Sequence, residues 1–365
     1  MSLKAGIVGL PNVGKSTLFN AITKKNILAA NYPFATIDPN VGIVMVPDER
    51  IENLKNMYNP ERTIFTSFEF TDIAGLVKGA SNGEGLGNKF LSHIREVDAI
   101  CHVVRCFENE NIIHVENGID PIRDIEIINV ELAISDLEII NSRIGKISKK
   151  AQTNRDKEAL IELETLNKAK TALEEGTPLR LIQFSKDERQ LLKNFSLITL
   201  KPVIYLANVS EEDLTSTNKY VDLVSEYGEK EGAQTIKICA KLESELSELD
   251  GEEKKEMLNV IGIEESSLDK LIKTTYEILG LATYFTVGSD EVRAWTFKRG
   301  MNAKECAGII HTDFEKGFIK AEVISYKDLI ECGSELRVRE MGRARLEGKD
   351  YLMQDGDICH FRFNV

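Results

Sequence analysis

The segment that most constrains the fold runs from Gly9 to Ser16 and reads G-L-P-N-V-G-K-S, which fits the pattern G-x-x-x-x-G-K-[ST] in full. Residues 5–8 before it form a short apolar run that predicts a buried strand, and residues 17–22 after it predict an opening helix. The glycines let the backbone curl so that successive N–H groups face one anion, and the helix start adds its positive dipole end. The alternative is a chance glycine-rich turn, but a strand and a helix in this order favour a phosphate-binding loop.

In such a loop each residue type has a role in binding a nucleoside triphosphate. Lys15 places a positive charge on the β- and γ-phosphates and is assigned a catalytic role, and the Ser16 hydroxyl is a ligand for Mg²⁺. The residues expected to bind the phosphates are Asn12, Val13, Gly14, Lys15, Ser16 and Thr17. The sequence therefore predicts an α/β domain of the P-loop class.

A second motif lies at residues 68–75, where a predicted strand ends in D-x-x-G. In P-loop proteins an aspartate at this place holds Mg²⁺ through its water ligands, which assigns Asp72 to the metal site. The glycine N–H meets the γ-phosphate, which assigns a catalytic role to Gly75. Thr36 lies between the two motifs and offers a second hydroxyl to the metal. Outside this context D-x-x-G would indicate only a turn, and Thr36 an ordinary loop residue.

Composition sets broad limits on the class of protein. The chain has 365 residues, of which 42% are hydrophobic and 29% are charged, which predicts an ordinary soluble protein of two or three domains. No apolar run reaches the ~20 residues that span a bilayer and no signal peptide is evident, so we expect a cytoplasmic protein without membrane contact. The six cysteines include no C-x-x-C pair, which favours reduced thiols over disulfides or zinc. The net charge of −13 argues against wrapping of nucleic acid, although a local basic patch is compatible with it.

Short apolar strands alternate with helices over residues 1–124 and 200–280, which predicts a nucleotide-binding domain with a parallel sheet. Beyond the strand at residues 5–8, strands are expected at 43–46, 68–72, 99–104, 201–207 and 235–240. A helix over 267–279 closes this domain. From 281 to 365 the pattern changes to short strands punctuated by glycines, which predicts a small α+β domain.

Residues 125–199 interrupt this pattern with two helical segments. Apolar residues recur at spacings of three and four, at Val130, Ala133, Leu137, Ile140, Ile144 and Ile147, and again at Leu163, Leu166, Ala169 and Leu173. Such a seam is typical of a coiled coil, so it predicts two antiparallel helices joined by a polar loop at 150–154. The alternative is a helix pair packed within the main core, but the strict seam and charged outer faces favour a protruding arm.

The residues that read the nucleotide base are expected after the strand at 201–207, where the chain reads N-V-S-E. A guanine-specific protein would have N-K-x-D here, and its aspartate accepts two hydrogen bonds worth about 1.5–3 kcal/mol each. Val209 and Glu211 replace the lysine and the aspartate, and the longer glutamate misplaces the carboxylate, so GTP should bind at least about tenfold more weakly. Asn208 still reaches a purine edge. The motif predicts a preference for ATP, or weak discrimination, unless the base is read elsewhere.

Together these motifs resemble the Obg-like ATPase family, also called YchF, of the translation-factor-related P-loop GTPases. The resemblance is carried by segments 9–16, 31–36, 72–80 and 208–211 and by the C-terminal domain. It implies a G domain, an inserted antiparallel coiled-coil arm, and a C-terminal TGS domain with a ubiquitin-like β-grasp fold. It also implies ATP hydrolysis and association with ribosomes. One departure is Cys239, where the family usually has serine, but a backbone N–H contact to the base would survive this change.

Hydrolysis requires a water molecule aligned with the γ-phosphate. Many relatives have a glutamine after the D-x-x-G motif that orients this water, but here the residue is Leu76, so we expect slow turnover. The family resemblance assigns the role to His114, whose neutral imidazole could orient the water or accept a proton; a loop histidine bonded to backbone is the alternative. Asn12 resembles an asparagine that helps to bind K⁺ in related proteins, although asparagine also suits a tight turn.

Together with the association with ribosomes that the resemblance implies, these observations predict a monomeric switch that binds Mg²⁺ and ATP and slowly hydrolyses ATP to ADP and phosphate. The expected partner is the large ribosomal subunit, whose RNA the arm and the TGS domain would contact. The residues in favour of RNA binding are four arginines, Arg337, Arg339, Arg343 and Arg345, for which a solvated strand face is the alternative. A rival function is a non-hydrolysing ATP-binding regulator or scaffold in stress or redox responses.

Overall fold

The computed structural model of the chain describes residues 3–25, 40–73, 86–109, 118–154, 156–249 and 251–364. The chain divides into two compact units. The first unit contains Met1–Val44 and Glu69–Leu271, and the second contains Met45–Phe68 and Ile272–Val365. The predicted boundaries assign residues 45–68 to the nucleotide-binding domain, whereas the structure packs them with the C-terminal residues.

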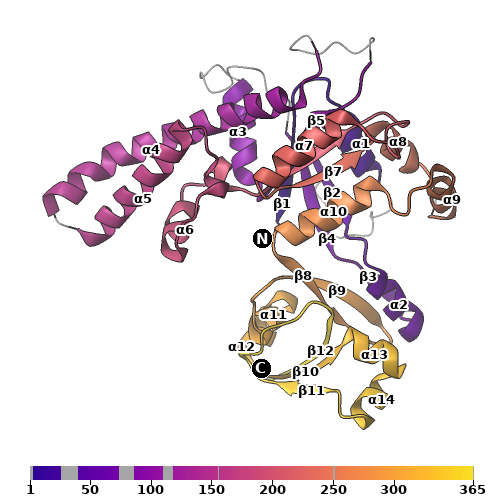
Figure 1. Cartoon of the computed structure of the whole chain (residues 1–365). Coiled ribbons are helices and arrows are strands. Elements are labelled where there is room, and N and C mark those ends of the chain that lie inside the picture. The colour runs from indigo at the N-terminus through magenta and orange to yellow at the C-terminus, as the bar shows by residue number, and fades with distance from the viewer. Residues whose placement is uncertain are drawn as a thin grey trace. The chain divides into compact units, whose positions relative to one another are not determined.

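The first unit contains, within the described residues, a six-stranded sheet with the order β2-β4-β1-β5-β6-β7 (Figure 1). Its strands are β1 (Lys4–Val8), β2 (Val41–Met45), β4 (Ser67–Asp72), β5 (Ala99–Arg105), β6 (Val203–Asn208) and β7 (Gln234–Ile238). β1 pairs in parallel with β4 and β5, and the parallel pairing continues from β5 to β6 and β7. Every residue of β5 and β6 is buried, as expected for central strands covered by helices on both faces. The predicted parallel α/β sheet is confirmed.

The described part of this unit also contains helices. They are α1 (Lys15–Lys25), α3 (Leu86–Glu96), α4 (Pro121–Asn154), α5 (Lys157–Glu174), α6 (Lys186–Lys193), α7 (Lys219–Lys230), α8 (Ala240–Leu246) and α9 (Gly251–Ile261), with short 3-10 turns at Leu179–Leu181 and Ile198–Leu200. The last helix before the C-terminal strands, α10 (Ser267–Ile278), contains the point at which the chain passes from the first unit to the second.

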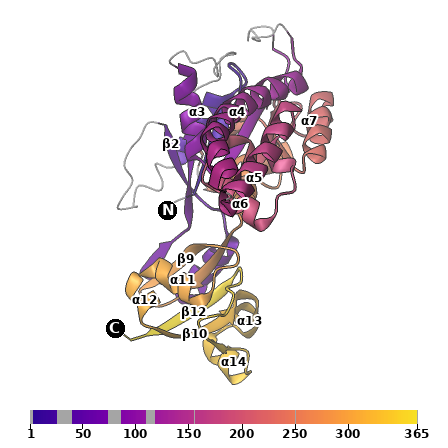
Figure 2. The same cartoon turned by 90° about the vertical axis from the view of Figure 1, so that its left-hand side faces the viewer.

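Helices α4 and α5 lie side by side (Figure 2). Apolar side chains form a seam that is buried between them. The predicted seam residues that are packed are Ala133, Leu137, Ile140, Ile144, Ile147, Leu163, Leu166, Ala169 and Leu173. Val130 is 55% exposed, so its assignment to the seam is wrong. The predicted loop at 150–154 is also wrong, because α4 remains helical to Asn154. α5 begins after Asp156, whose carboxylate accepts hydrogen bonds from the N–H groups of Glu158 and Ala159.

The second unit contains, within its described residues, a six-stranded sheet with the order β11-β10-β12-β8-β9-β3. Its strands are β3 (Arg62–Ile64), β8 (Leu281–Thr286), β9 (Glu291–Lys298), β10 (Phe318–Ser325), β11 (Arg345–Glu347) and β12 (Asp357–Phe363), and its helices are α2 (Glu49–Tyr58), α11 (Ala303–Ile310), α12 (Thr312–Lys316), α13 (Tyr326–Cys332) and α14 (Glu335–Glu340). The central strands β8 and β12 are parallel, and each pairs on its other side with an antiparallel neighbour.

Helix α2 and strand β3 complete the second unit although they come from the N-terminal part of the sequence. Ile51 and Leu54 of α2 are fully buried in the same apolar cluster as Phe285 and Val292. β3 pairs in parallel with β9 and extends the sheet at its edge. The helix begins with Asp48, whose carboxylate accepts a hydrogen bond from the backbone of the first turn. The C-terminal core is therefore built from two separate segments of sequence.

We expect Leu54→Ala to destabilise the second unit by about 2–5 kcal/mol, because it removes a fully buried side chain and leaves a cavity. Trp295, the single tryptophan of the chain, lies in β9 of this unit and reports its unfolding by fluorescence in denaturant. Val260→Ala is the control, since Val260 belongs to the first unit and is 87% exposed. An unchanged Trp295 transition in Leu54→Ala would show that α2 does not support this core.

Candidate functional site

The loop between β1 and α1 holds the backbone in two left-handed conformations, at Asn12 with φ of 64° and at Gly14 with φ of 95°. A Cβ atom at Gly14 would lie 2.2 Å from the side-chain nitrogen of Asn208, so only glycine fits this position. The carbonyl of Gly14 accepts a hydrogen bond from Leu18 N at 3.0 Å, which starts α1 directly after the turn. The strand, turn and helix predicted around residues 9–16 are therefore present in the structure.

A cavity of about 580 Å³ opens beside this loop. Its lining comes from the loop, from the first turn of α1 and from the end of β4: Leu10, Pro11, Asn12, Gly14, Lys15, Ser16, Thr17 and Asp72. Ser16 and Thr17 are exposed, which leaves the Ser16 hydroxyl accessible. Val13 differs from the other predicted phosphate-binding residues, because its side chain is buried below the loop. Residues of the phosphate loop and Asp72 of the D-x-x-G motif therefore line the same cavity.

Lys15 and Asp72 meet in this cavity, where the ammonium group of Lys15 contacts the carboxylate of Asp72. Both side chains are largely shielded from solvent, with 9% and 19% exposed. Among the described residues no cluster of three or more acidic, histidine or cysteine side chains could hold a metal by itself. A hydroxyl from Ser16 and a carboxylate from Asp72 are oxygen donors of the type that Mg²⁺ prefers, and Mg²⁺ usually takes its other ligands from water and substrate phosphates.

Asn208, at the end of β6, connects the phosphate loop to the start of α8. Its side-chain nitrogen donates to Val13 O at 2.8 Å, and its side-chain oxygen accepts from Ala240 N at 3.0 Å. Asn208 is buried, so each bond satisfies a group that water does not reach. The amide that the motif assigns to the purine edge thus already holds two loops together.

The other residues predicted to read the base lie around the ends of β6 and β7. Val209 is buried and its N–H donates to Ile238 O at 2.8 Å. The carboxylate of Glu211 forms an ion pair with Lys241 at 2.8 Å. Cys239 is buried at the N-terminus of α8, and burial raises the pKa of its thiol, which keeps it neutral and unreactive. Lys241 was not assigned a role from the sequence, although it lies in the C-A-K segment next to Cys239.

Four residues with predicted roles lie outside the described part of the chain: Thr36, Gly75, Leu76 and His114. The geometry of the metal ligand Thr36, of the glycine N–H and of the water-positioning histidine therefore stays a prediction. Across the ranges that the structure describes, no helix is both long and apolar enough to cross a membrane.

The C-terminal arginine cluster is largely neutralised by neighbouring carboxylates. Arg339 pairs with Glu322 and Glu335, Arg343 pairs with Asp328 and Glu331, and Arg345 pairs with Glu347 and Asp357. These arginines lie on α14, on the following turn and on β11, so the cluster is not one strand face. Arg337 alone forms no ion pair within the described residues. The net positive charge of the patch is much smaller than the sequence suggests.

We expect Asn208→Ala to lower the free energy of unfolding of the first unit by about 2 kcal/mol or more, because Val13 O and Ala240 N lose buried partners worth about 1–3 kcal/mol each. Asn208→Asp keeps the acceptor for Ala240 N but turns a carboxylate oxygen toward Val13 O in a buried place, so it should destabilise the unit at least as much. Far-ultraviolet circular dichroism in urea measures both variants. Equal stability of the parent and Asn208→Ala would mean that the two amide bonds add nothing.

Two family models match the chain. The model MMR_HSR1, described as 50S ribosome-binding GTPase, matches residues 4–168. The model YchF-GTPase_C, described as a protein of unknown function, matches residues 281–364. The first match contains the phosphate loop and Asp72, and the second contains most of the C-terminal sheet.

Full-length relatives agree with these matches. The chain is 58% identical to the "Ribosome-binding ATPase YchF" of Bacillus subtilis (strain 168) and 51% identical to that of Escherichia coli O157:H7, in each case over 100% of both chains. The solved structure of the Schizosaccharomyces pombe YchF GTPase is 43% identical, covers 99% of this chain and 98% of its own, and superposes with a TM-score of 0.91. Identity at this level along the whole chain confirms the resemblance seen in the motifs: the chain belongs to the YchF family.

Proposed function

We propose that this chain is a ribosome-associated ATPase that binds Mg²⁺ and ATP in the cavity beside the phosphate loop and slowly hydrolyses the ATP to ADP and phosphate. The observation that carries the proposal is the meeting of Lys15 and Asp72 beside the loop, in a chain 58% identical to a ribosome-binding ATPase. The proposed location is the cytoplasm. The six cysteines support it, since all are buried free thiols.

The proposed roles follow the chemistry of phosphoryl transfer, in which catalysis is mostly positioning and charge neutralisation. Ser16 and Thr36 would hold Mg²⁺ directly and Asp72 through water ligands of the metal, and the bound metal would neutralise charge on the phosphate oxygens. Lys15 would leave Asp72 and turn to the β- and γ-phosphates. In this proposal the Gly75 N–H meets the γ-phosphate and His114 orients the attacking water. Leu76 cannot hold water, so the proposed turnover is slow.

Potassium is a further part of the proposal. Asn12 lines the cavity next to the phosphates, where its side chain would help to hold K⁺. The left-handed backbone at Asn12 also fits its other reading, a residue chosen for a tight turn. Both readings agree with its place in the loop.

A preference for ATP over GTP is proposed from the residues after β6. The Glu211 carboxylate faces Lys241 and forms an ion pair with it, so it is already engaged by a cation at the position where guanine-specific proteins need a free aspartate. Val209 supplies no charge at the base. Adenine has no 2-amino group and requires no such acceptor, so it loses nothing.

The double variant Val209→Lys, Glu211→Asp restores N-K-x-D, and we expect it to raise the affinity for GTP relative to ATP at least about tenfold, the equivalent of 1.4 kcal/mol. Calorimetric titration of parent and variant with both nucleotides measures the ratio. Val209→Lys alone is the matched control, since it adds the lysine without the shorter carboxylate. A parent that binds GTP far more tightly than ATP contradicts the proposed preference.

The same preparation tests the reaction. Single-turnover assays with and without ribosomes should release phosphate from ATP slowly, and Lys15→Ala should abolish the release because the phosphate charge is no longer neutralised. If no phosphate is released over hours in either condition, the chain is an ATP-binding regulator and not an ATPase.

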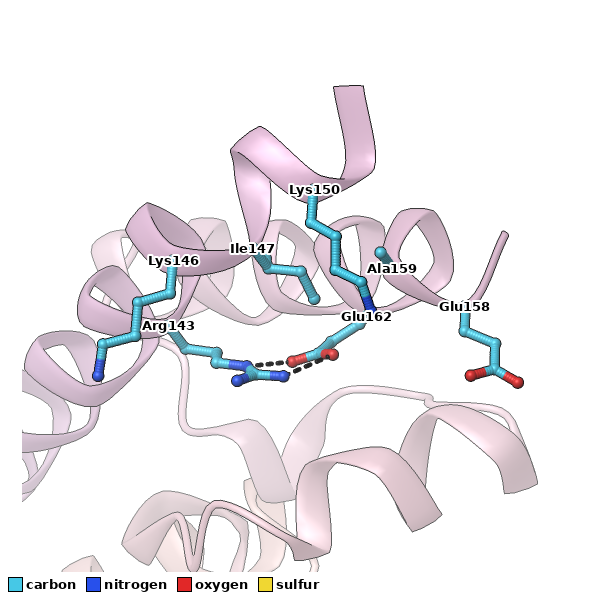
Figure 3. Close-up of a pocket in the computed structure, with 7 residues that line it drawn as sticks. All are labelled: Arg143, Lys146, Ile147, Lys150, Glu158, Ala159 and Glu162. Atoms are coloured by element: carbon cyan, nitrogen blue, oxygen red, sulfur yellow. Dashed lines mark hydrogen bonds and ion pairs between the residues drawn. The ribbon is translucent and has the colours of Figure 1, made fainter. Parts of the chain in front are cut away.

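Ribosome association is proposed to use the helical arm and the C-terminal unit, with RNA of the large subunit as the contact. On the arm, α4 and α5 line a cavity of about 260 Å³ (Figure 3). Its charged lining residues are three basic ones, Arg143, Lys146 and Lys150, and two acidic ones, Glu158 and Glu162. Arg143 pairs with Glu162 and Lys150 with Asp156, whereas Lys146 points away from these carboxylates. Lys146 on the arm and Arg337 in the C-terminal unit are therefore cations that carry no carboxylate partner within the described residues.

We expect Lys146→Ala with Arg337→Ala to weaken co-sedimentation with ribosomes. Each phosphate contact contributes about 0.7–0.9 to the slope of log affinity against log salt, so this slope should fall by about 1.4–1.8. The matched control is Arg143→Ala with Arg343→Ala, which removes the same charge from the same two regions but from residues already held by carboxylates. Equal effects of the two pairs, or no effect of either, would count against these contacts.

A further inference from the structure

The loop that follows β6 is held in place by one lysine of the neighbouring strand. The ammonium group of Lys237, in β7, donates to three backbone carbonyls: Asp213 O at 2.9 Å, Leu214 O at 3.2 Å and Ser216 O at 2.6 Å. A lysine ammonium has three N–H donors, so these carbonyls use its full capacity. Lys237 itself is part of a strand that is paired along its length with β6. The loop is thereby fixed to the sheet.

This loop begins with the residues to which base recognition is assigned. Glu211 O accepts a hydrogen bond from Leu214 N at 3.2 Å, so one of the residues that Lys237 holds is bonded directly to Glu211. Ser210 is tied to Asp213 by a hydrogen bond of 2.8 Å between their side-chain oxygens. Ser210 and Glu211 are therefore each hydrogen-bonded to a residue whose backbone carbonyl is held by Lys237.

We propose that Lys237 is a positioning residue for base selection, which acts through the loop 209–216 and rests on the proposed reading of the base by Val209 and Glu211. The cavity beside the phosphate loop is lined by other residues, so Lys237 acts at a distance from the phosphates. A loop ordered before the nucleotide arrives loses less conformational entropy on binding than a loose one. Loss of the ammonium group should therefore weaken recognition of the base and leave recognition of the phosphates intact.

The same chemistry occurs a second time in the first unit and provides a control. Lys201 donates to Ile94 O at 2.8 Å, to Arg95 O at 2.7 Å and to Val97 O, which closes the end of α3. Like Lys237, it satisfies three backbone carbonyls with one ammonium group, but it lies away from the loop 209–216. Burial lowers the pKa of Lys201 to about 8, so an assay at about pH 7 keeps this group protonated.

The experiment compares Lys237→Met, which keeps an unbranched apolar stem and removes the ammonium group, with Lys201→Met. Calorimetry at about pH 7 with Mg²⁺ measures Kd for ATP, for GTP and for inorganic tripolyphosphate, which has no base. We expect Lys237→Met to weaken the affinity for ATP at least about fivefold and to bring the Kd values for ATP and GTP closer together. The Kd for tripolyphosphate should stay as in the parent. Lys201→Met should leave the ratio between ATP and GTP as in the parent.

Three results would overturn the inference. The first is an unchanged affinity for ATP in Lys237→Met, and the second is an equal loss of affinity for ATP and for tripolyphosphate in that variant. The third is the same change in the ratio of the ATP and GTP Kd values in Lys201→Met. Lys237→Gln keeps two donors and should give an intermediate loss, so it provides the measurement if Lys237→Met does not fold. The proposed ATP preference is tested separately, because it is contradicted if the parent protein binds GTP more tightly than ATP. In that case the effect of Lys237→Met is measured on the affinity for GTP.

Discussion

The buried amide of Asn208 is the contact on which the geometry of the candidate site depends. It joins the phosphate loop at residue 13 to the start of α8 at residue 240, and it lies at the end of β6. The amide leaves no space for a Cβ atom at position 14, so the loop needs a glycine there for Asn208 to approach it. The phosphate loop is thus held by the end of β6, the same segment that leads to the residues assigned to the base.

Much of this site could be predicted from the sequence because its signals are local. The phosphate loop, the strand before it and the helix after it form one continuous segment, and the structure places Asp72 beside Lys15 as the second motif implied. The use of Asn208 as a bridge could not be read in the same way, since its partners are backbone groups of distant loops. The pairing of Lys241 with Glu211 also depends on the register of two strands and not on spacing in one segment.

The main errors of prediction concern contacts between segments that are far apart in the sequence. Helix α2 has only two buried residues, Ile51 and Leu54, so its pattern gives little indication of which core receives it. The arginine cluster was interpreted by its own charge, but four of its carboxylate partners come from α13, β10 and β12 and become its neighbours only in the folded chain. Val130 fits the spacing of the seam, yet the partner helix does not cover it.

The C-terminal core is built from two segments that are far apart in the sequence, so its parts are synthesised at different times. More than 200 residues separate β3, which ends at Ile64, from β8, which begins at Leu281. At about 5–20 residues per second, the early helix and strand wait roughly 10–40 s before their partner strands exist. During that interval the apolar side of α2 has no native core to enter, so the N-terminal half of a nascent chain carries a surface that a chaperone could recognise.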